Sequence, residues 1–222
     1  MQILKTKELQ SDKITCLIYG IPGIGKTTLL GMLPGKTLII DIDKGTRVLS
    51  DCENVDVVRI SEDLHEIAEI LNELTTKCMY KNVAVDSLSE LESGLLAYYG
   101  RRGNNDGVPG VQDYGRANQK ISDLCRQLRV LPCNVFFTAW ETQGEIIAPT
   151  GEKYTQARPL IRDKIVNTIC GLCDIVGQVT FSYKNPDNPQ RYVKLEGSNE
   201  VFAKDRVYKR KGCLFEELIP NE

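Results

Sequence analysis

A glycine-rich run near the N-terminus has the residue types and the spacing that a phosphate-binding loop requires. Its residues fit the pattern G-x-x-x-x-G-K-[ST] at every defined position, and the pattern ends in Gly25, Lys26 and Thr27. Glycines allow a tight turn whose N–H groups point at phosphate oxygens, the lysine reaches the β- and γ-phosphates, and the threonine hydroxyl binds Mg²⁺. The pattern predicts a site for ATP and Mg²⁺ formed by Gly20, Ile21, Pro22, Gly23, Ile24, Gly25, Lys26, Thr27 and Thr28.

A carboxylate that suits this site follows a short apolar run further along the chain. Residues 83–85 are valine, alanine and valine, and Asp86 comes directly after them. A buried strand that ends in an acid is the Walker B arrangement, whose carboxylate holds the magnesium ion of a bound nucleotide. We therefore predict Thr27 and Asp86 as the metal ligands.

Hydrolysis of a triphosphate also needs a carboxylate that orients or deprotonates the attacking water. Ser87 follows Asp86, so the pair of adjacent acids found in many ATPases is absent. Asp41 and Asp43 both lie near the end of a predicted strand, and Asp43 is nearer the carboxyl end, where ligands gather in open α/β sheets. We predict Asp43 as the catalytic carboxylate, with Glu141 as the second choice. The alternative is that Asp43 only begins a turn.

The segments that must position these residues alternate between strand and helix, which calls for a parallel sheet covered on both faces. Apolar, β-branched segments predict strands at residues 14–19, 37–42, 55–60, 82–87 and 134–140. Amphipathic patterns predict helices at residues 26–33, after the cap Ser61 with an apolar face from Leu64 to Leu74, after the strand at residues 82–87 through Tyr99, from Asp113 to Leu131, and at residues 160–172.

The C-terminal part of the chain has a different pattern. Pro149, Thr150 and Gly151 predict the turn of a hairpin within residues 144–154, and residues 174–183, 192–195 and 213–218 read as antiparallel additions. The expected fold class is therefore α/β, with a mostly parallel sheet flanked by helices and antiparallel strands at its C-terminal side. We expect a polar lead over residues 1–13 and one domain over residues 14–222.

Composition excludes some classes of protein. No apolar run approaches the roughly 18 residues that span a bilayer, and the polar N-terminus does not resemble a signal peptide, so we expect a cytoplasmic protein without a membrane partner. The net charge is −2, so any nucleic-acid site must be a local basic patch. The eight cysteines are expected to be free thiols. Cys170 and Cys173 form a CxxC pair, for which a metal or redox role is the alternative.

Several segments, taken together, resemble a known family. Residues 40–46 and 85–87 are similar to the RecA strands that carry the catalytic and Walker B acids. Residues 113–132, 134–141, 174–177 and 203–206 resemble motifs of phage P-loop ATPases that act as minimal RecA-like recombinases and single-strand annealing proteins. The resemblance runs from about residue 13 to residue 220. It implies a RecA-like P-loop core, assembly into a homo-oligomeric ring or filament, and work in the host cytoplasm.

The same resemblance assigns roles to further residues. Thr138 corresponds to a polar sensor of the γ-phosphate and counts among the catalytic residues with Lys26, Asp43 and Glu141. Lys204 and Arg206 fall where RecA-like proteins offer cations to the nucleotide of the neighbouring subunit; the alternative is an ordinary basic surface. The usual RecA-like glutamate is replaced by the shorter Asp43, which implies slow hydrolysis.

Two segments correspond to loops that touch single-stranded DNA in such proteins, residues 101–112 and 142–159. Cations beside flexible glycines and an aromatic ring suit a phosphate backbone and a stacked base. Solvated loops without a ligand are the alternative. The candidate DNA-binding residues are Arg101, Arg102, Asn104, Asn105, Lys153, Tyr154 and Arg158.

The leading hypothesis is a Mg²⁺-dependent, DNA-stimulated ATPase that binds single-stranded DNA and promotes strand annealing in homologous recombination. The alternatives are a DNA-translocating motor of the helicase kind, a small-molecule kinase with residues 101–112 as a lid, and a nucleotide switch. The switch would recruit a partner such as a single-strand DNA-binding protein.

Overall fold

A computed structural model describes residues 13–60, 66–182 and 188–220. Most of the predicted N-terminal lead and the predicted helix cap Ser61, with Leu64 after it, lie outside the described residues. No described helix is long and apolar enough to cross a membrane.

The core is a mixed sheet with the strand order β10-β8-β7-β1-β5-β4-β2-β3. From β7 to β3 all neighbouring strands run parallel, whereas β8, β9 and β10 are added antiparallel on the other side. The predicted α/β class with antiparallel C-terminal additions is confirmed. The strands are β1 (Thr15–Gly20), β2 (Thr37–Asp41), β3 (Val55–Arg59), β4 (Asn82–Asp86), β5 (Asn134–Ile147), β6 (Lys153–Pro159), β7 (Ile175–Ser182), β8 (Gln190–Lys194), β9 (Lys204–Asp205) and β10 (Gly212–Leu214).

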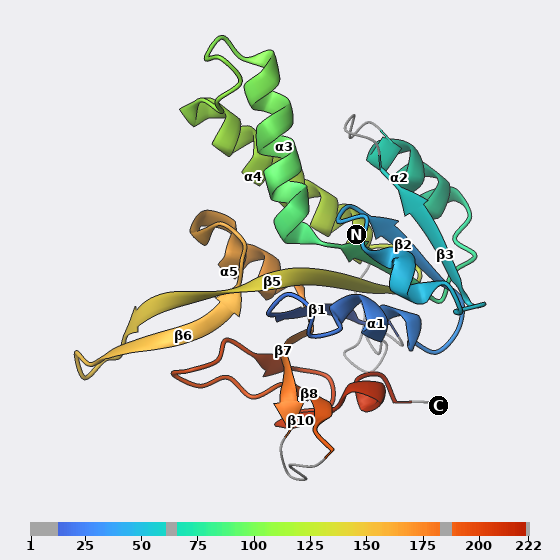
Figure 1. Cartoon of the computed structure of the whole chain (residues 1–222), viewed down its shortest axis with the longest axis vertical. Helices are drawn as coiled ribbons and strands as arrows, with labels where there is room; N and C mark the ends of the chain where they lie inside the picture. Colours follow the sequence, from blue (N-terminus) through green and yellow to red (C-terminus); the bar gives the residue numbers. More distant parts are fainter. Residues whose placement is uncertain (1–12, 61–65, 183–187, 221–222) are drawn as a thin grey trace, which may run out of the picture.

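Helices cover both faces of the sheet because alternate residues of its buried strands point to opposite sides. In β1, Leu17 and Tyr19 join the core under α2, α3, α4 and α5, while Cys16 and Ile18 join the core under α1 and the 3₁₀ turns. Figure 1 shows α3 and α4 extending beyond the sheet as a helical pair. The helical elements are α1 (Lys26–Gly31), η2 (Thr46–Leu49), α2 (Glu66–Thr76), α3 (Leu88–Arg102), α4 (Val111–Arg129), α5 (Asp163–Leu172) and η3 (Phe215–Glu217).

Several element boundaries differ from the sequence prediction. The helix predicted from Asp113 begins at Val111, because the Asp113 carboxylate accepts a hydrogen bond from Gly110 N (2.8 Å) and so caps the helix from within its first turn. The helix predicted from residue 160 begins at Asp163. The strand predicted to end at Trp140 continues to Ile147, because it pairs with β6 over its whole second half.

A buried polar network connects the ends of the sheet's strands at which the strands begin. Asn134 Nδ2 donates to Asn82 Oδ1 (3.0 Å), and Ile14 N donates to Asn134 Oδ1 (3.0 Å). Asn82 Nδ2 in turn donates to Pro34 O and to Thr37 Oγ1, both at 3.1 Å. These bonds join β1, β5, β4 and β2, so the register of four parallel strands depends on two asparagines.

Replacing Asn134 by alanine is expected to destabilise the protein by about 1–3 kcal/mol, since it leaves Ile14 N and Asn82 Oδ1 buried without these partners. Chemical denaturation monitored by circular dichroism measures the change. Gln119→Ala removes an exposed amide that bonds only Asp123 among the described residues, and is the control, expected within about 0.5 kcal/mol of the parent. Equal stability of the two variants would show that the network contributes little.

Candidate functional site

The glycine-rich run forms the turn from β1 into α1, at the edge where the parallel strands end. Gly23 and Gly25 adopt φ values of 79° and 103°, a left-handed conformation that side-chain-bearing residues rarely adopt. Ile24 lies between them with its side chain buried in the core, which anchors the loop. The loop therefore has the backbone conformation that a phosphate cradle needs, and its anchoring residue is packed against the sheet.

Lys26 is folded back on this loop. Its side chain is 7% exposed, and Nζ donates to the carbonyl oxygens of Gly20 (2.9 Å) and Ile21 (3.1 Å). Burial lowers the pKa of Lys26, while the charges of Asp86, Asp43 and Glu141 oppose that change. A buried ammonium held by carbonyls and surrounded by acids is a cation for which a phosphate group would be a stronger partner.

The predicted metal ligands lie in contact with each other. Thr27 Oγ1 donates to Asp86 Oδ2 (2.7 Å), and the buried Thr138 hydroxyl on β5 donates to Asp86 Oδ1. Burial raises the pKa of Asp86, and the hydrogen bonds from Thr138 and Thr27 counteract it. A hydroxyl and a carboxylate beside the phosphate cradle are hard oxygen ligands of the kind that Mg²⁺ prefers, so the residues present fit that ion.

The structure separates the two aspartates at the end of β2. Asp41 is fully buried and accepts hydrogen bonds from Thr46 Oγ1 (2.6 Å) and Gly45 N (3.2 Å), with Arg59 Nε at 3.6 Å. It closes the turn after β2 and is not available for a water molecule. Asp43 and Lys44 lie within this turn, and Lys44 has a φ of 57°.

Asp43 lies beside the metal ligands. Its backbone N donates to Asp86 O (3.1 Å), and its carboxylate accepts from Ser87 N (3.0 Å) and Ser87 Oγ (2.8 Å). Burial raises the pKa of Asp43, and the two bonds from Ser87 counteract it. The position is that of a carboxylate next to the phosphate cradle, held in one orientation.

Glu141, the second candidate, follows the β5 residue that pairs with Gly20. Its carboxylate accepts from Gln178 Nε2 (2.9 Å) on β7, and its charge acts on Lys26 together with those of Asp43 and Asp86. Both candidate carboxylates therefore lie at the end of the sheet that carries the glycine-rich loop.

Two residues of this site, Ser87 and Gln178, are not among those predicted from the sequence. The sequence marks Ser87 only as the place where a second acid is absent, yet it binds Asp43 and also caps α3 by accepting from Glu90 N (3.3 Å). A serine between a predicted strand and a helix is a recognisable cap, so this signal was present. The contact of Gln178 with Glu141 spans two strands and leaves no local signature.

The segments predicted as DNA-binding loops are more ordered than expected. Arg101 and Arg102 belong to the last turn of α3 rather than to a loop, and the Arg102 guanidinium lies 3.6 Å from the centre of the Tyr98 ring. Asn104 and Asn105 do lie in the connection to α4. The first segment is predicted as a loop, but it forms the tip of the α3–α4 pair, because α3 continues past Gly100.

The second segment is a two-stranded ribbon, which confirms the hairpin predicted within residues 144–154. It is longer than predicted, because β5 and β6 pair from Glu141–Pro159 to Ile147–Lys153. On this ribbon Lys153 Nζ binds Glu145 (3.0 Å), and Tyr154 OH donates to Glu152 (2.5 Å). The ribbon projects from the sheet in Figure 1. It presents regularly spaced side chains on two faces.

A groove of about 1330 Å³ separates this ribbon from α3, α4 and α5. Arg158 lines it from the ribbon and Asn118 from α4, and among the described residues no partner binds the buried Arg158 Nε or Asn118 Oδ1. Arg162 also lines it, with its guanidinium 4.1 Å from the Tyr114 ring centre. The lining is of mixed charge, because it also includes Glu92, Glu145 and Asp163.

Lys204 and Arg206 lie far from the phosphate cradle. Lys204 is in β9, which pairs with the first residues of β7, whereas the cradle follows the last residue of β1, parallel to β7. Burial, followed by the charge of Arg206, lowers the pKa of Lys204. These two cations thus lie towards the end of the sheet at which β1 and β7 begin, whereas the glycine-rich loop lies at the end at which the parallel strands finish.

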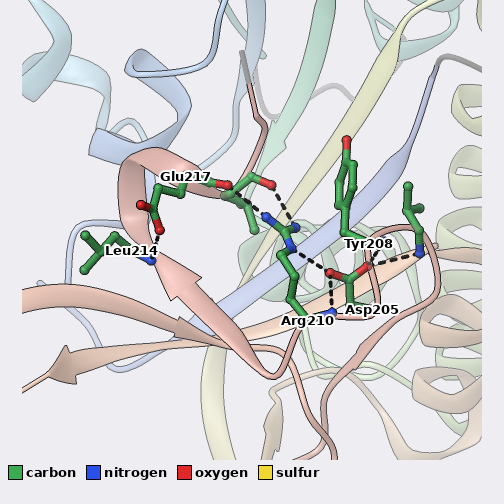
Figure 2. A network of polar contacts seen from close by, with 7 residues as sticks. Asp205, Tyr208, Arg210, Leu214 and Glu217 are labelled. Carbon is green, nitrogen blue, oxygen red and sulfur yellow. Dashed lines mark hydrogen bonds and ion pairs between the residues drawn. The ribbon is translucent and has the colours of Figure 1, made fainter. Parts of the chain in front are cut away.

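Their neighbour Arg210 is committed to the fold, as Figure 2 shows. Its Nε donates to Asp205 Oδ2 (2.9 Å), and its terminal nitrogens donate to the carbonyls of Glu217 (2.9 Å) and Leu218 (3.0 Å). Burial acts to raise the pKa of Asp205, but the bonds from Arg210 and Tyr208 N outweigh it and lower that pKa. Part of the basic run is therefore structural.

The cysteines are free thiols, as predicted. Cys170 and Cys173 are buried, and burial raises the pKa of Cys170 to about 12. Within the described residues no group of three or more His, Cys, Asp or Glu side chains could hold a metal ion. The CxxC pair has the environment of core residues.

Comparison with known proteins agrees with this geometry. A family model described as an AAA domain matches residues 12–207. No curated protein matches the chain.

Several solved structures have a similar fold at low sequence identity. A KaiC-like protein from Pyrococcus horikoshii is 16% identical with a TM-score of 0.43, over 81% of this chain and 76% of that one. The flagellar accessory protein FlaH from Methanocaldococcus jannaschii is 9% identical with a TM-score of 0.43, over 90% and 83%. An uncharacterized protein from Pyrococcus horikoshii, solved with an unknown peptide, is 10% identical with a TM-score of 0.46, over 90% and 91%.

Proposed function

The chain belongs to the AAA domain family and has the fold of a RecA-like P-loop ATPase, and from this premise we propose that it is a slow, Mg²⁺-dependent ATPase stimulated by single-stranded DNA. The observation that carries the proposal is the contact of Thr27 with Asp86 (2.7 Å) beside the buried Lys26, with Asp43 held at the same edge. These contacts support a site in which Lys26 binds phosphate, Thr27 and Asp86 hold the metal ion and Asp43 acts as the base.

In the proposed reaction the loop N–H groups and Lys26 bind the phosphates. Thr27 and Asp86 would hold Mg²⁺, which would supply positive charge to offset the charge of the phosphates. Asp43 orients the attacking water and accepts its proton. The water oxygen forms a bond to the γ-phosphorus as the bond to the bridging oxygen of ADP breaks, which gives ADP and phosphate. Thr138 holds Asp86 in place through its hydrogen bond.

The proposed DNA site comprises the tip of the α3–α4 pair and the β5–β6 ribbon, on either side of the groove. The Lys153–Glu145 ion pair is exposed, and pairs of this kind contribute only about 0–1 kcal/mol, so a phosphate can replace the carboxylate. Arg158 Nε already lacks a partner among the described residues. Tyr154 on the ribbon and Tyr114 in the groove offer rings on which bases can stack.

We further propose that a second copy of the chain completes the assembly. Lys204 and Arg206 lie towards the opposite end of the strands from their own cradle, and we assign them to the nucleotide of a neighbouring copy. A ring or filament built in this way would couple ATP binding to the grip on DNA, as expected of the phage annealing proteins that the sequence resembles. Strand annealing during recombination is the proposed outcome.

A nucleotide switch is the second candidate function. Ser87 donates two hydrogen bonds to the Asp43 carboxylate, which makes it a weaker base than a free carboxylate of similar burial. ATP binding without appreciable turnover would then recruit a partner such as a single-strand DNA-binding protein.

ATP hydrolysis measured with and without single-stranded DNA, at low and high salt, tests the proposal. We expect stimulation that decreases at high salt, because counterions compete with phosphate contacts. Turnover that is measurable but indifferent to DNA would contradict the DNA part of the proposal. Binding without turnover under all conditions would favour the switch.

Replacing Lys153 and Arg158 together by alanine is expected to weaken DNA binding and to reduce its logarithmic salt dependence by roughly one to two charges, because each cation neutralises one phosphate. Fluorescence anisotropy with a labelled oligonucleotide measures both quantities. Lys36→Ala is the control, since Lys36 pairs with Asp56 beside β3 at the far side of the sheet. An unchanged salt slope in the double variant would exclude the ribbon as the DNA site.

A further inference from the structure

A cation from the C-terminal strands lies directly on the phosphate cradle. Arg191, in β8, donates from Nε to the carbonyl oxygen of Ile24 (2.9 Å). A Cβ atom placed on Gly25 would lie 2.7 Å from Arg191 Nε and 3.1 Å from Cζ, so the guanidinium rests on the backbone of Gly25. Glycine at this position is therefore needed twice, for its φ of 103° and for the close approach of Arg191.

The guanidinium is held from behind by an aromatic ring. Its Cζ lies 5.8 Å from the centre of the Phe215 ring, within the range of a cation–π contact. Among the described residues, Ile24 O is the hydrogen-bond acceptor of this side chain. A guanidinium has five N–H donors in a planar fork that matches phosphate oxygens, so the terminal nitrogens remain available to a ligand.

The strand order places Arg191 on the side of the cradle away from the proposed metal ligand Asp86. Asp86 and Thr138 are on β4 and β5, on one side of β1, whereas β7 and β8 are on the other side. With Mg²⁺ held by Asp86, the γ-phosphate of a bound ATP would lie on the β4 side. The α- and β-phosphates would then be nearer to Gly25 and β8.

We propose that Arg191 is a nucleotide-binding residue that contacts the α- and β-phosphates of the ATP or ADP held by the cradle. This inference rests on the proposed nucleotide site and extends it with a cation from the same chain, in addition to Lys26. Because the contact is to phosphates that both nucleotides share, it strengthens ATP and ADP binding alike and leaves the chemical step unchanged.

A purely structural role for Arg191, as a clip on the Ile24 carbonyl, makes a different prediction. Glutamine at this position keeps an amide N–H for that carbonyl but removes the charge, so a clip would survive Arg191→Gln. Lysine keeps the charge and loses the planar fork. The two substitutions therefore separate charge from geometry.

The test measures ADP affinity by calorimetry and the ATPase parameters kcat and KM for the full chain. Arg191→Gln is expected to weaken ADP binding and raise the KM for ATP by about tenfold or more, with kcat within about twofold, and Arg191→Lys is expected to recover part of the ADP affinity. Lys194→Gln removes an exposed cation from the same strand and is the matched control, expected to leave ADP affinity unchanged. Thermal midpoints of all variants confirm that they are folded.

Two results would overturn the inference: unchanged ADP affinity in a folded Arg191→Gln variant, or a loss of kcat with unchanged ADP affinity, which would move the contact to the γ-phosphate. If Arg191→Gln fails to fold, Arg191→Lys is the deciding variant. An ADP affinity of Arg191→Lys equal to that of the parent at every salt concentration would exclude a phosphate contact made by the planar guanidinium. A parent protein that binds neither ADP nor ATP would refute the proposed nucleotide site itself, which is a distinguishable outcome.

Discussion

Asp43→Asn is expected to lower ATP turnover by about 100- to 10,000-fold while ATP binding stays intact. Asparagine keeps an oxygen that can accept the hydrogen bonds from Ser87 N and Ser87 Oγ, so the side chain stays in place. It cannot take the proton of the attacking water. Single-turnover hydrolysis and binding of a fluorescent ATP analogue measure the two effects separately.

The matched variant is Glu141→Gln, which keeps an acceptor for Gln178 and removes the charge of the other candidate carboxylate. We expect its turnover to remain within about tenfold of the parent, since Glu141 acts on the site only through its field. Normal hydrolysis by Asp43→Asn together with a large loss in Glu141→Gln would transfer the catalytic role to Glu141.

Lys26→Ala is expected to abolish measurable nucleotide-dependent activity, with a loss of about 100- to 1000-fold in turnover and weaker ATP binding. The reason is that the variant loses the ammonium that Lys26 Nζ holds against the carbonyls of the loop. Steady-state hydrolysis and ATP titration measure the loss.

Stability distinguishes this loss from unfolding. Burial already lowers the pKa of Lys26, which means that the charged form is unfavourable there without a phosphate partner. The alanine variant is therefore expected to keep the thermal midpoint of the parent. Lys36→Ala, with its exposed ion pair to Asp56, is the control for losing a lysine as such. A Lys26→Ala variant that is folded and fully active would contradict the assigned role.

The sequence alone was sufficient to predict the cradle and the parallel sheet, because both depend on local patterns. The loop motif is contiguous. The strands β1, β2 and β4 are buried along their whole length, so each appears in the sequence as a mostly apolar run. The fold class is confirmed for this reason. Asp86 could be identified because it ends such a strand.

Long-range contacts could not be predicted in the same way. The continuation of β5 past Trp140 depends on pairing with β6, whereas the local sequence indicates only a short hairpin within residues 144–154. Ser87 and Asp43 meet because β2 and β4 are neighbours. Arg191 meets Ile24 across 167 positions of sequence, so nothing near either residue signals the contact.

Calorimetric titration of the parent protein with ATP, in Mg²⁺ and again in EDTA, tests the central claim most directly. We expect one nucleotide site per chain, with an ATP affinity that falls when Mg²⁺ is removed and is strongly reduced in Lys26→Ala. A folded parent protein that binds no ATP in Mg²⁺, or one whose binding is the same in Lys26→Ala, would contradict it.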